Sequence, residues 1–178
     1  MTSELSDEVI TVDEFHRKVE ANAVGPKAEL IRGRVHERMS KSPLHTRIAS
    51  LLFARLYEAL PNFWVRMEQP LTLSDSEPEP DISVVPGAID DYLNHPNTAL
   101  LVVEVALNSE AVDRRKGQVY AEAGVGEFWL VVPERRVIEV HSAPSPAGWG
   151  KVVCCWEGEL IRTGIAQLEG LAVSEFLR

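Results

Sequence analysis

One carboxylate interrupts the most apolar segment of the chain. Residues 99–107 read Ala-Leu-Leu-Val-Val-Glu-Val-Ala-Leu, so Glu104 is the only charged side chain in a run that is apolar at both parities. Such a run predicts a strand buried on both faces, as in the centre of an α/β sheet. A carboxylate buried there is unfavourable unless a cation, a metal or dense hydrogen bonding receives it. Glu104 is therefore predicted to pair with an Arg or Lys, or to bind a metal.

The remaining pattern predicts one α/β domain with a central mixed β-sheet flanked by helices. The chain has 178 residues, of which 45% are hydrophobic and 25% charged, which suits one domain with its own core. The expected parts are an N-terminal helix at about 11–22, a core at about 28–142, and a C-terminal hairpin and tail at 149–178, in which 150–156 pairs with 160–162.

Two further residues predict a charged site near Glu104. Asp81 stands at the start of another apolar strand, and Lys116 lies on a predicted helix, 110–123, that follows the Glu104 strand directly. Lys116 falls inside the apolar stripe of that helix, where a solvated lysine is not expected. The alternative is a lysine that reaches solvent from the helix edge. Two strand-borne carboxylates and a lysine suit metal-assisted hydrolysis of a phosphodiester.

Three other polar residues are individually ambiguous. Glu29 lies on a short predicted strand and is most simply a solvated residue. His45 stands in the first turn of a predicted helix, where it could contact a phosphate or serve in capping or packing. Gln69, next to Pro70, offers no clearer signal.

The net charge of −9 speaks against a protein that coats nucleic acid non-specifically. It does not exclude a nuclease, because carboxylates at a metal site add negative charge that the metal offsets. The longest apolar run is too short to cross a bilayer, and residues 1–4 lack a signal-peptide pattern. The adjacent Cys154 and Cys155 would point to opposite faces of a strand, so we expect no disulfide between them and a cytoplasmic setting.

Taken together, these residues resemble a known family. The segments that carry the resemblance are Glu29, His45, Pro80-Asp81, Glu104-Val105, 113–116, 120–125 and 127–131. They resemble the bacterial "putative restriction endonuclease" family, a former domain of unknown function within the PD-(D/E)XK nuclease superfamily. The resemblance covers roughly residues 29–140, and its most specific part is the spacing from Lys116 through Tyr120 to the segment 127–131.

The resemblance implies a restriction-endonuclease-like core, in which a central mixed sheet lies between helices. It implies that Asp81 and Glu104 are metal ligands, helped by the carbonyl of Val105, with Glu29 reaching the metal directly or through water. Ala106 stands where the superfamily motif has its lysine. In this family the lysine has moved to the following helix, and Lys116 is the matching position.

The sequence therefore predicts a Mg²⁺- or Mn²⁺-dependent DNA endonuclease, and the resemblance implies that its products carry a 5′-phosphate and a 3′-hydroxyl. The catalytic residues would be Asp81, Glu104, Lys116 and Glu29, and the candidate substrate contacts are His45, Gln69 and Arg115.

The alternative is a catalytically silent nuclease-fold domain that binds a protein or a nucleic acid, which the net charge and Ala106 favour. We also expect a homodimer with Trp149 and Trp156 at its interface, unless these aromatic side chains cover the domain's own core.

Overall fold

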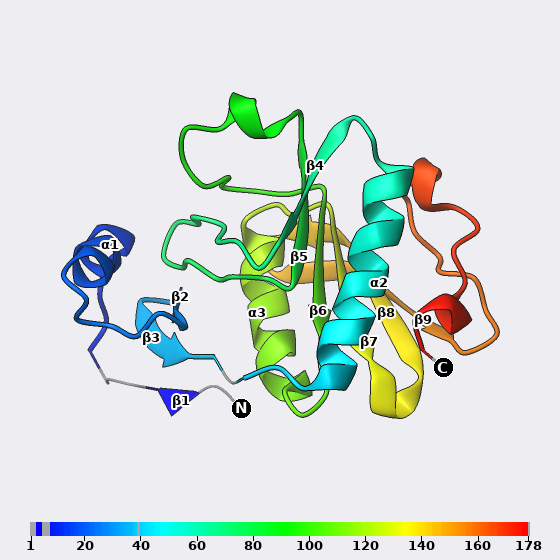
Figure 1. The fold of residues 1–178 in the computed structure, drawn as a ribbon, viewed down its shortest axis with the longest axis horizontal. Coiled ribbons are helices and arrows are strands. Elements are labelled where there is room, and N and C mark those ends of the chain that lie inside the picture. The colour runs from blue at the N-terminus through cyan, green and yellow to red at the C-terminus, as the bar shows by residue number, and fades with distance from the viewer. Residues whose placement is uncertain (1–2, 5–7, 39, 178) are drawn as a thin grey trace.

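The computed structural model describes residues 3–4, 8–38 and 40–177 (Figure 1). The helices are α1 (Val12–Glu20), α2 (Pro43–Ala59) and α3 (Glu110–Glu122). The strands are β1 (Ser3–Glu4), β2 (Ala28–Ile31), β3 (Arg34–Glu37), β4 (Phe63–Met67), β5 (Ile82–Pro86), β6 (Leu101–Val105), β7 (Glu127–Val132), β8 (Val137–Ser145) and β9 (Gly148–Trp156). Short 3₁₀ turns occupy η1 (Ile89–Asp91), η2 (Pro133–Arg135), η3 (Ala166–Leu168) and η4 (Val173–Glu175). Among these described helices, none combines the length and apolarity needed to span a bilayer.

A mixed sheet of six strands forms the centre of the molecule, in the order β4-β5-β6-β7-β8-β9. Strands β6 and β7 run parallel, and the other neighbours are antiparallel. Helix α3 connects the parallel pair, because two parallel strands need a crossover that returns the chain to the same end of the sheet. The predicted mixed α/β architecture is confirmed.

Helices α2 and α3 cover opposite faces of the main sheet, and strand β6 contributes to both layers. Leu101, Val103 and Val105 pack in the core cluster that includes α2. Val102, between them, packs in the cluster that includes α3. Every residue of β6 is buried, as its uninterrupted apolar pattern predicted. Glu104 alternates with the residues facing α2, so its side chain extends toward α3.

Residues 3–4 and 8–38, which we call the wing, form a smaller unit at one side of the main sheet (Figure 1). Here β3 lies between β1 and β2. Helix α1 packs against this small sheet through Phe15, which joins Ile10, Leu30 and Val35 in an apolar cluster. The N-terminus of α1 is closed by a capping box between Thr11 and Glu14, as its sequence spacing predicted. Strand β2 carries Glu29 from the wing toward the main sheet.

The predicted pairing inside the C-terminal hairpin is wrong. Strand β9 pairs with β8 and becomes the sixth strand of the main sheet. The backbone N–H of Ile161 donates instead to the carbonyl of Leu171 at 2.8 Å. The β8–β9 pairing buries Cys155 in the core under α2, while Cys154 faces the α3 side. The following tail then packs Leu168, Val173 and Phe176 into the same core, which the hairpin prediction did not allow for.

Candidate active site

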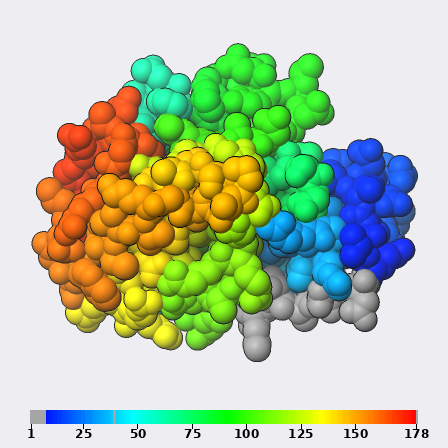
Figure 2. Space-filling view, turned by 180° about the vertical axis from the view of Figure 1, so that it is seen from behind, coloured from blue at the N-terminus to red at the C-terminus, as the bar shows by residue number. Residues whose placement is uncertain are grey.

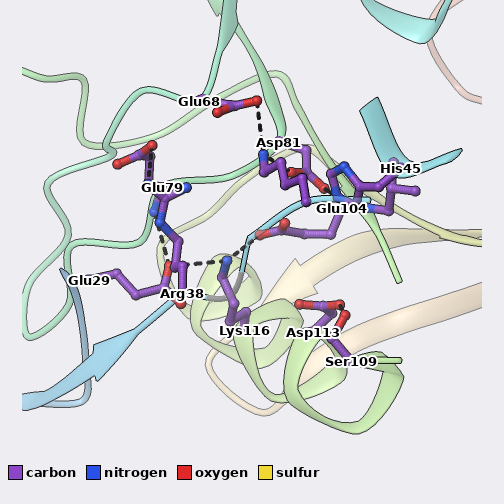
Figure 3. A network of polar contacts seen from close by, with 12 residues as sticks. Glu29, Arg38, His45, Glu68, Glu79, Asp81, Glu104, Ser109, Asp113 and Lys116 are labelled. Atoms are coloured by element: carbon purple, nitrogen blue, oxygen red, sulfur yellow. Dashed lines mark hydrogen bonds and ion pairs between the residues drawn. The ribbon is translucent and has the colours of Figure 1, made fainter. Parts of the chain in front are cut away.

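A cavity of about 170 Å³ opens where β5, β6, α3 and the start of α2 come together. Figure 3 shows the polar side chains that converge there. Six of the residues singled out in the sequence line this cavity: Glu29, His45, Asp81, Glu104, Val105 and Lys116. The fold thus gathers residues from the wing, two helices and two strands into one place.

Lys116 bridges two buried carboxylates. Its Nζ lies 2.6 Å from Oε1 of Glu104 and 3.3 Å from Oε2 of Glu29 (Figure 3). Lys116 is only 5% exposed, so it does not reach solvent from the helix edge. Burial alone would lower the pKa of Lys116, but the charges of Glu104 and Glu29 outweigh it and raise that pKa well above its usual value. Lys116 is therefore a buried, protonated cation.

Glu104 accepts a second hydrogen bond, from the hydroxyl of Tyr120 at 2.7 Å. Tyr120 lies one turn after Lys116 on α3, so both donors come from the same helix face. Burial raises the pKa of Glu104 to about 8; Lys116 opposes this rise, whereas the nearby Asp81 and Asp113 add to it. Burial of Glu104 therefore disfavours its charged form.

Asp81 comes to the same place through strand pairing. In the antiparallel β5–β6 ladder Ile82 pairs with Val103, and extending this register by one residue sets Asp81 opposite Glu104. The backbone N–H of Val105 donates to Oδ2 of Asp81 at 2.8 Å, which anchors the carboxylate at the end of β6.

Two side chains near the N-terminal end of α2, Lys41 and His45, also contact Asp81. Nζ of Lys41 donates to Oδ1 at 2.6 Å, and Nε2 of His45 lies 3.0 Å from Oδ2. Burial would raise the pKa of Asp81, but the contacts with His45 and Lys41 outweigh it and hold that pKa below its ordinary value. His45 therefore reaches the site through Asp81, while its Nδ1 is buried without a partner among the described residues.

Sequence reasoning missed several charged residues of the cavity. Lys41 also contacts Glu68, at 3.0 Å, and Nη2 of Arg38 lies 2.5 Å from Oε1 of Glu79. These residues lie on loops or at strand ends, where no periodic pattern distinguishes an inward side chain from a solvated one.

Asp113 is the missed residue that had a signal in the sequence. It lies three residues before Lys116 on α3, a spacing that places both on one helix face. Its carboxylate accepts a short hydrogen bond from the hydroxyl of Ser109. Burial raises the pKa of Asp113, and Lys116 partly offsets the rise.

The lining of the cavity carries an excess of negative charge. Its carboxylates are Glu29, Glu79, Asp81, Glu104 and Asp113, and its formally cationic side chains are Arg38, Lys41 and Lys116. Five carboxylates against three cations leave two uncompensated charges, the amount that one divalent ion supplies. The pKa values of Glu79, Glu104 and Asp113 are all raised, and burial is the largest cause for each.

The donor set fits a hard divalent ion. Within the described part of the chain, no three His, Cys, Asp or Glu side chains form a ready-made metal cage. Mg²⁺ does not require one, because it keeps several waters and is held by one or two carboxylates together with substrate oxygens. The paired Asp81 and Glu104, with backbone oxygen available at the end of β6, provide ligands of this kind.

Two of the predicted substrate contacts lie outside the cavity. Oε1 of Gln69 accepts a hydrogen bond from Nε of Arg66 at 3.2 Å. Arg115 is exposed on α3, beside Lys116, and lines a neighbouring groove. Their contact with a substrate stays a prediction.

The two tryptophans proposed for an interface differ in their surroundings. Trp149 donates from Nε1 to the carbonyl of Gly117 at 2.9 Å and stacks near Phe128, so it covers the domain's own core. Trp156 is 46% exposed, with the guanidinium of Arg135 over its ring. Only Trp156 is therefore free to contribute substantially to the predicted dimer interface.

Comparison with known proteins agrees with the geometry. A solved structure described as a putative nuclease belonging to DUF820, from Anabaena variabilis ATCC 29413, matches with a TM-score of 0.79 and 18% identity. The match covers 94% of this chain and 97% of that one, and at this identity it concerns the fold. No curated protein matches the chain. The family model Uma2, described as "Putative restriction endonuclease", matches residues 12–173, and the chain therefore belongs to this family.

Proposed function

We propose that the protein is a Mg²⁺- or Mn²⁺-dependent DNA endonuclease that hydrolyses phosphodiester bonds. The observation that carries the proposal is the buried group formed by Asp81, Glu104 and Lys116, in which Nζ of Lys116 lies 2.6 Å from Glu104 at an open cavity. Membership of the restriction endonuclease family supports a nuclease. The metal and the DNA substrate are inferred from the chemistry of the site.

Asp81, Glu104 and the carbonyl of Val105 would hold the divalent ion, with Glu29 supporting it directly or through water. When bound, the ion supplies Lewis-acid activation of water and neutralises charge on the phosphate. Lys116 orients the attacking water and offsets the negative charge that develops on the phosphorus oxygens. The charges of Glu104 and Glu29 outweigh the effect of burial and keep this cation protonated and close to the carboxylates.

Lys41 and His45 position Asp81. Nζ of Lys41 is 2.6 Å from Oδ1 of Asp81, and Nε2 of His45 is 3.0 Å from Oδ2. Lys41 therefore neutralises the carboxylate that would bind the ion. Because Lys41 is partly exposed on a loop, it is free to turn toward a substrate phosphate when a metal takes its place.

The test is cleavage of supercoiled plasmid by purified protein with Mg²⁺ or Mn²⁺, against the same reaction in EDTA. We expect Asp81→Asn and Glu104→Gln to lower the rate by about two or more powers of ten, the scale for losing a group that stabilises charge in the transition state. Glu58→Gln, an exposed change on α2, is the matched control and should cleave normally. The proposal fails if the wild type does not cleave, or if Glu104→Gln cleaves equally well.

One observation favours the catalytically silent alternative. Lys41 and Lys116 already neutralise Asp81 and Glu104, so the site is partly compensated without a metal. Mn²⁺ titration separates the two functions. A working site binds Mn²⁺ with an affinity that Asp81→Asn abolishes, whereas a silent domain shows no binding that depends on Asp81.

A further inference from the structure

A second groove adjoins the catalytic cavity, between the wing and α3. Its volume is about 560 Å³. Glu29, Val112 and Lys116 line both the groove and the catalytic cavity, so the two spaces meet at these residues. Figure 2 shows the β2–β3 part of the wing (light blue) beside α3 (yellow-green) on this face of the molecule. A chain-like ligand in the cavity therefore has a direct path into the groove.

The groove is a basic region of an acidic protein. The wing contributes Arg32, Arg34 and His36 to its lining, and α3 contributes Arg115. The one carboxylate among its described lining residues is Glu29, which Lys116 neutralises. Because the whole chain has a net charge of −9, this concentration of arginine is a local exception. Such a surface suits a polyanion, whose phosphates attract arginine even where the rest of the protein repels them.

The exposed side chain of Arg115 is available to bind a ligand. It is exposed on α3 and forms no hydrogen bond or ion pair with the residues that the structure describes. Arg115 lies two residues after Asp113 and directly before Lys116 on α3, so its side chain leaves the helix next to that of the catalytic lysine. A phosphate next to the one at Lys116 would meet Arg115 first.

Arg32, on the wing, lines the same groove as Arg115 and has an unusual backbone. Arg32 (φ 50°) and Gly33 (φ 71°) form the turn between β2 and β3, where positive φ at both positions normally selects Asn, Asp or Gly. The turn carries the side chain of Arg32 toward α3. Its Nη2 lies 2.8 Å from Oε1 of Glu122 on α3, and Glu122 is partly exposed. A phosphate could replace Glu122 as the partner of Arg32.

We propose that this groove binds the sugar–phosphate backbone of a DNA strand on one side of the scissile bond, with Arg115 and Arg32 as its phosphate-binding residues. The inference rests on the proposed function for the position of the scissile phosphate at Lys116. Glu122 acts as an internal competitor that occupies Arg32 until DNA arrives. The groove volume lies in the range of ~300–1,000 Å³ found for small-molecule sites, which is enough for a short length of backbone.

The test is binding of a fluorescein-labelled 20-base-pair DNA duplex, and of one of its single strands, followed by anisotropy over a series of NaCl concentrations. Measurements in EDTA and in Ca²⁺ separate binding from Mg²⁺- or Mn²⁺-dependent cleavage. Each neutralised phosphate contributes about −0.9 to the slope of log K against log salt, or roughly tenfold in affinity near 0.1 M salt. We expect Arg115→Ala to remove one such contribution and Arg32→Ala/Arg115→Ala to remove about two. Glu122→Gln should tighten binding.

Two variants serve as matched controls. Arg136→Ala changes an exposed arginine that also has positive φ (51°) and pairs with Glu157, whereas Arg32 pairs with Glu122 and, at 3.9 Å, with Asp75. Arg162→Ala changes another exposed arginine away from the groove. Neither should alter the affinity or the salt slope. Arg115→Ala removes no hydrogen bond or ion pair with a described residue, and an unchanged melting temperature would show that its effect on binding does not arise from misfolding.

The outcomes separate this inference from the proposed function. If wild type cleaves with Mn²⁺ but the groove variants bind DNA with unchanged affinity and slope, the groove is overturned and the nuclease stands. If the groove variants lose binding as expected but wild type does not cleave, the groove stands and the nuclease does not. If wild type binds neither duplex nor single strand in EDTA or Ca²⁺, the groove is overturned.

Discussion

Replacing Lys116 by methionine tests the electrostatic centre of the site. Methionine has similar length and fills the same space, so the change removes the charge while creating little cavity. Glu104 and Glu29 would then be left buried, at 4% and 2% exposure, without their shared cation. Removing one partner of a buried ion pair destabilises a protein by about 3–5 kcal/mol. Glu104 keeps the hydroxyl of Tyr120 as a donor, which favours the lower half of this range.

The measurement is urea unfolding in EDTA near pH 7.5, together with thermal melting. A loss of about 3–5 kcal/mol corresponds to roughly 6–20 °C in melting temperature for a chain of this size. The double variant Lys116→Met/Glu104→Gln should recover at least about half of the loss, because it removes the unpaired charge and keeps an acceptor for Tyr120. Lys151→Met, on an exposed part of β9, is the control and should change stability by no more than about 0.5 kcal/mol.

Divalent ion should partly rescue Lys116→Met, because a ligand that binds only the folded state stabilises it, by about 2.7 kcal/mol at 100 times its dissociation constant. Cleavage should remain lower than wild type by about two or more powers of ten even when the metal is saturating. Wild-type stability of Lys116→Met, with a melting temperature that does not respond to metal, would refute the view that Lys116 compensates Glu104 and Glu29.

Three other predictions concern stability and assembly. Burial raises the pKa of Glu139, but the nearby imidazole of His141 and the two hydrogen bonds from Arg114 outweigh it and lower that pKa from its usual 4.5 to about 2. The Glu139–Arg114 pair therefore stabilises the protein above about pH 4.5 and loses its contribution as the pH falls toward 2. We expect Glu139→Gln to reduce the loss of unfolding free energy between pH 6 and pH 3 by about 1–2 kcal/mol, after allowance for solvent around Arg114. An unchanged pH dependence would contradict this. A Cβ on Gly117 would lie only 2.6 Å from Cε1 of Phe128. Gly117→Ala should therefore lower the free energy of unfolding by about 1–2 kcal/mol, although alanine has the better helix propensity. An equal or higher melting temperature would argue against this prediction. Light scattering at micromolar concentration should give the mass of a homodimer, and a monomeric mass would remove that prediction.

Local sequence determined one half of the candidate site. The apolar run around Glu104 specifies a strand buried on both faces, and the 3.6-residue period of the next helix places Lys116 on its buried side. Because α3 follows β6 directly and returns the chain to the parallel strand β7, the carboxylate and the lysine meet across the shortest available path. The capping box at Thr11 and the helices α1 and α3 are similarly local, since a few neighbouring residues decide them.

Tertiary structure alone decided the other half. Asp81 faces Glu104 because of the β5–β6 register, which depends on how both whole faces of the sheet pack and not on any residue near Asp81. The pairing of β9 with β8, where the sequence suggested 160–162, has the same cause: pairing along β8 places Val153 and Cys155 against the core under α2. Lys41, Arg38 and the groove beside Arg32 depend on how the wing and the loops lie against the main sheet. Those contacts join residues far apart in the sequence, and short-range periodicity carries no information about them.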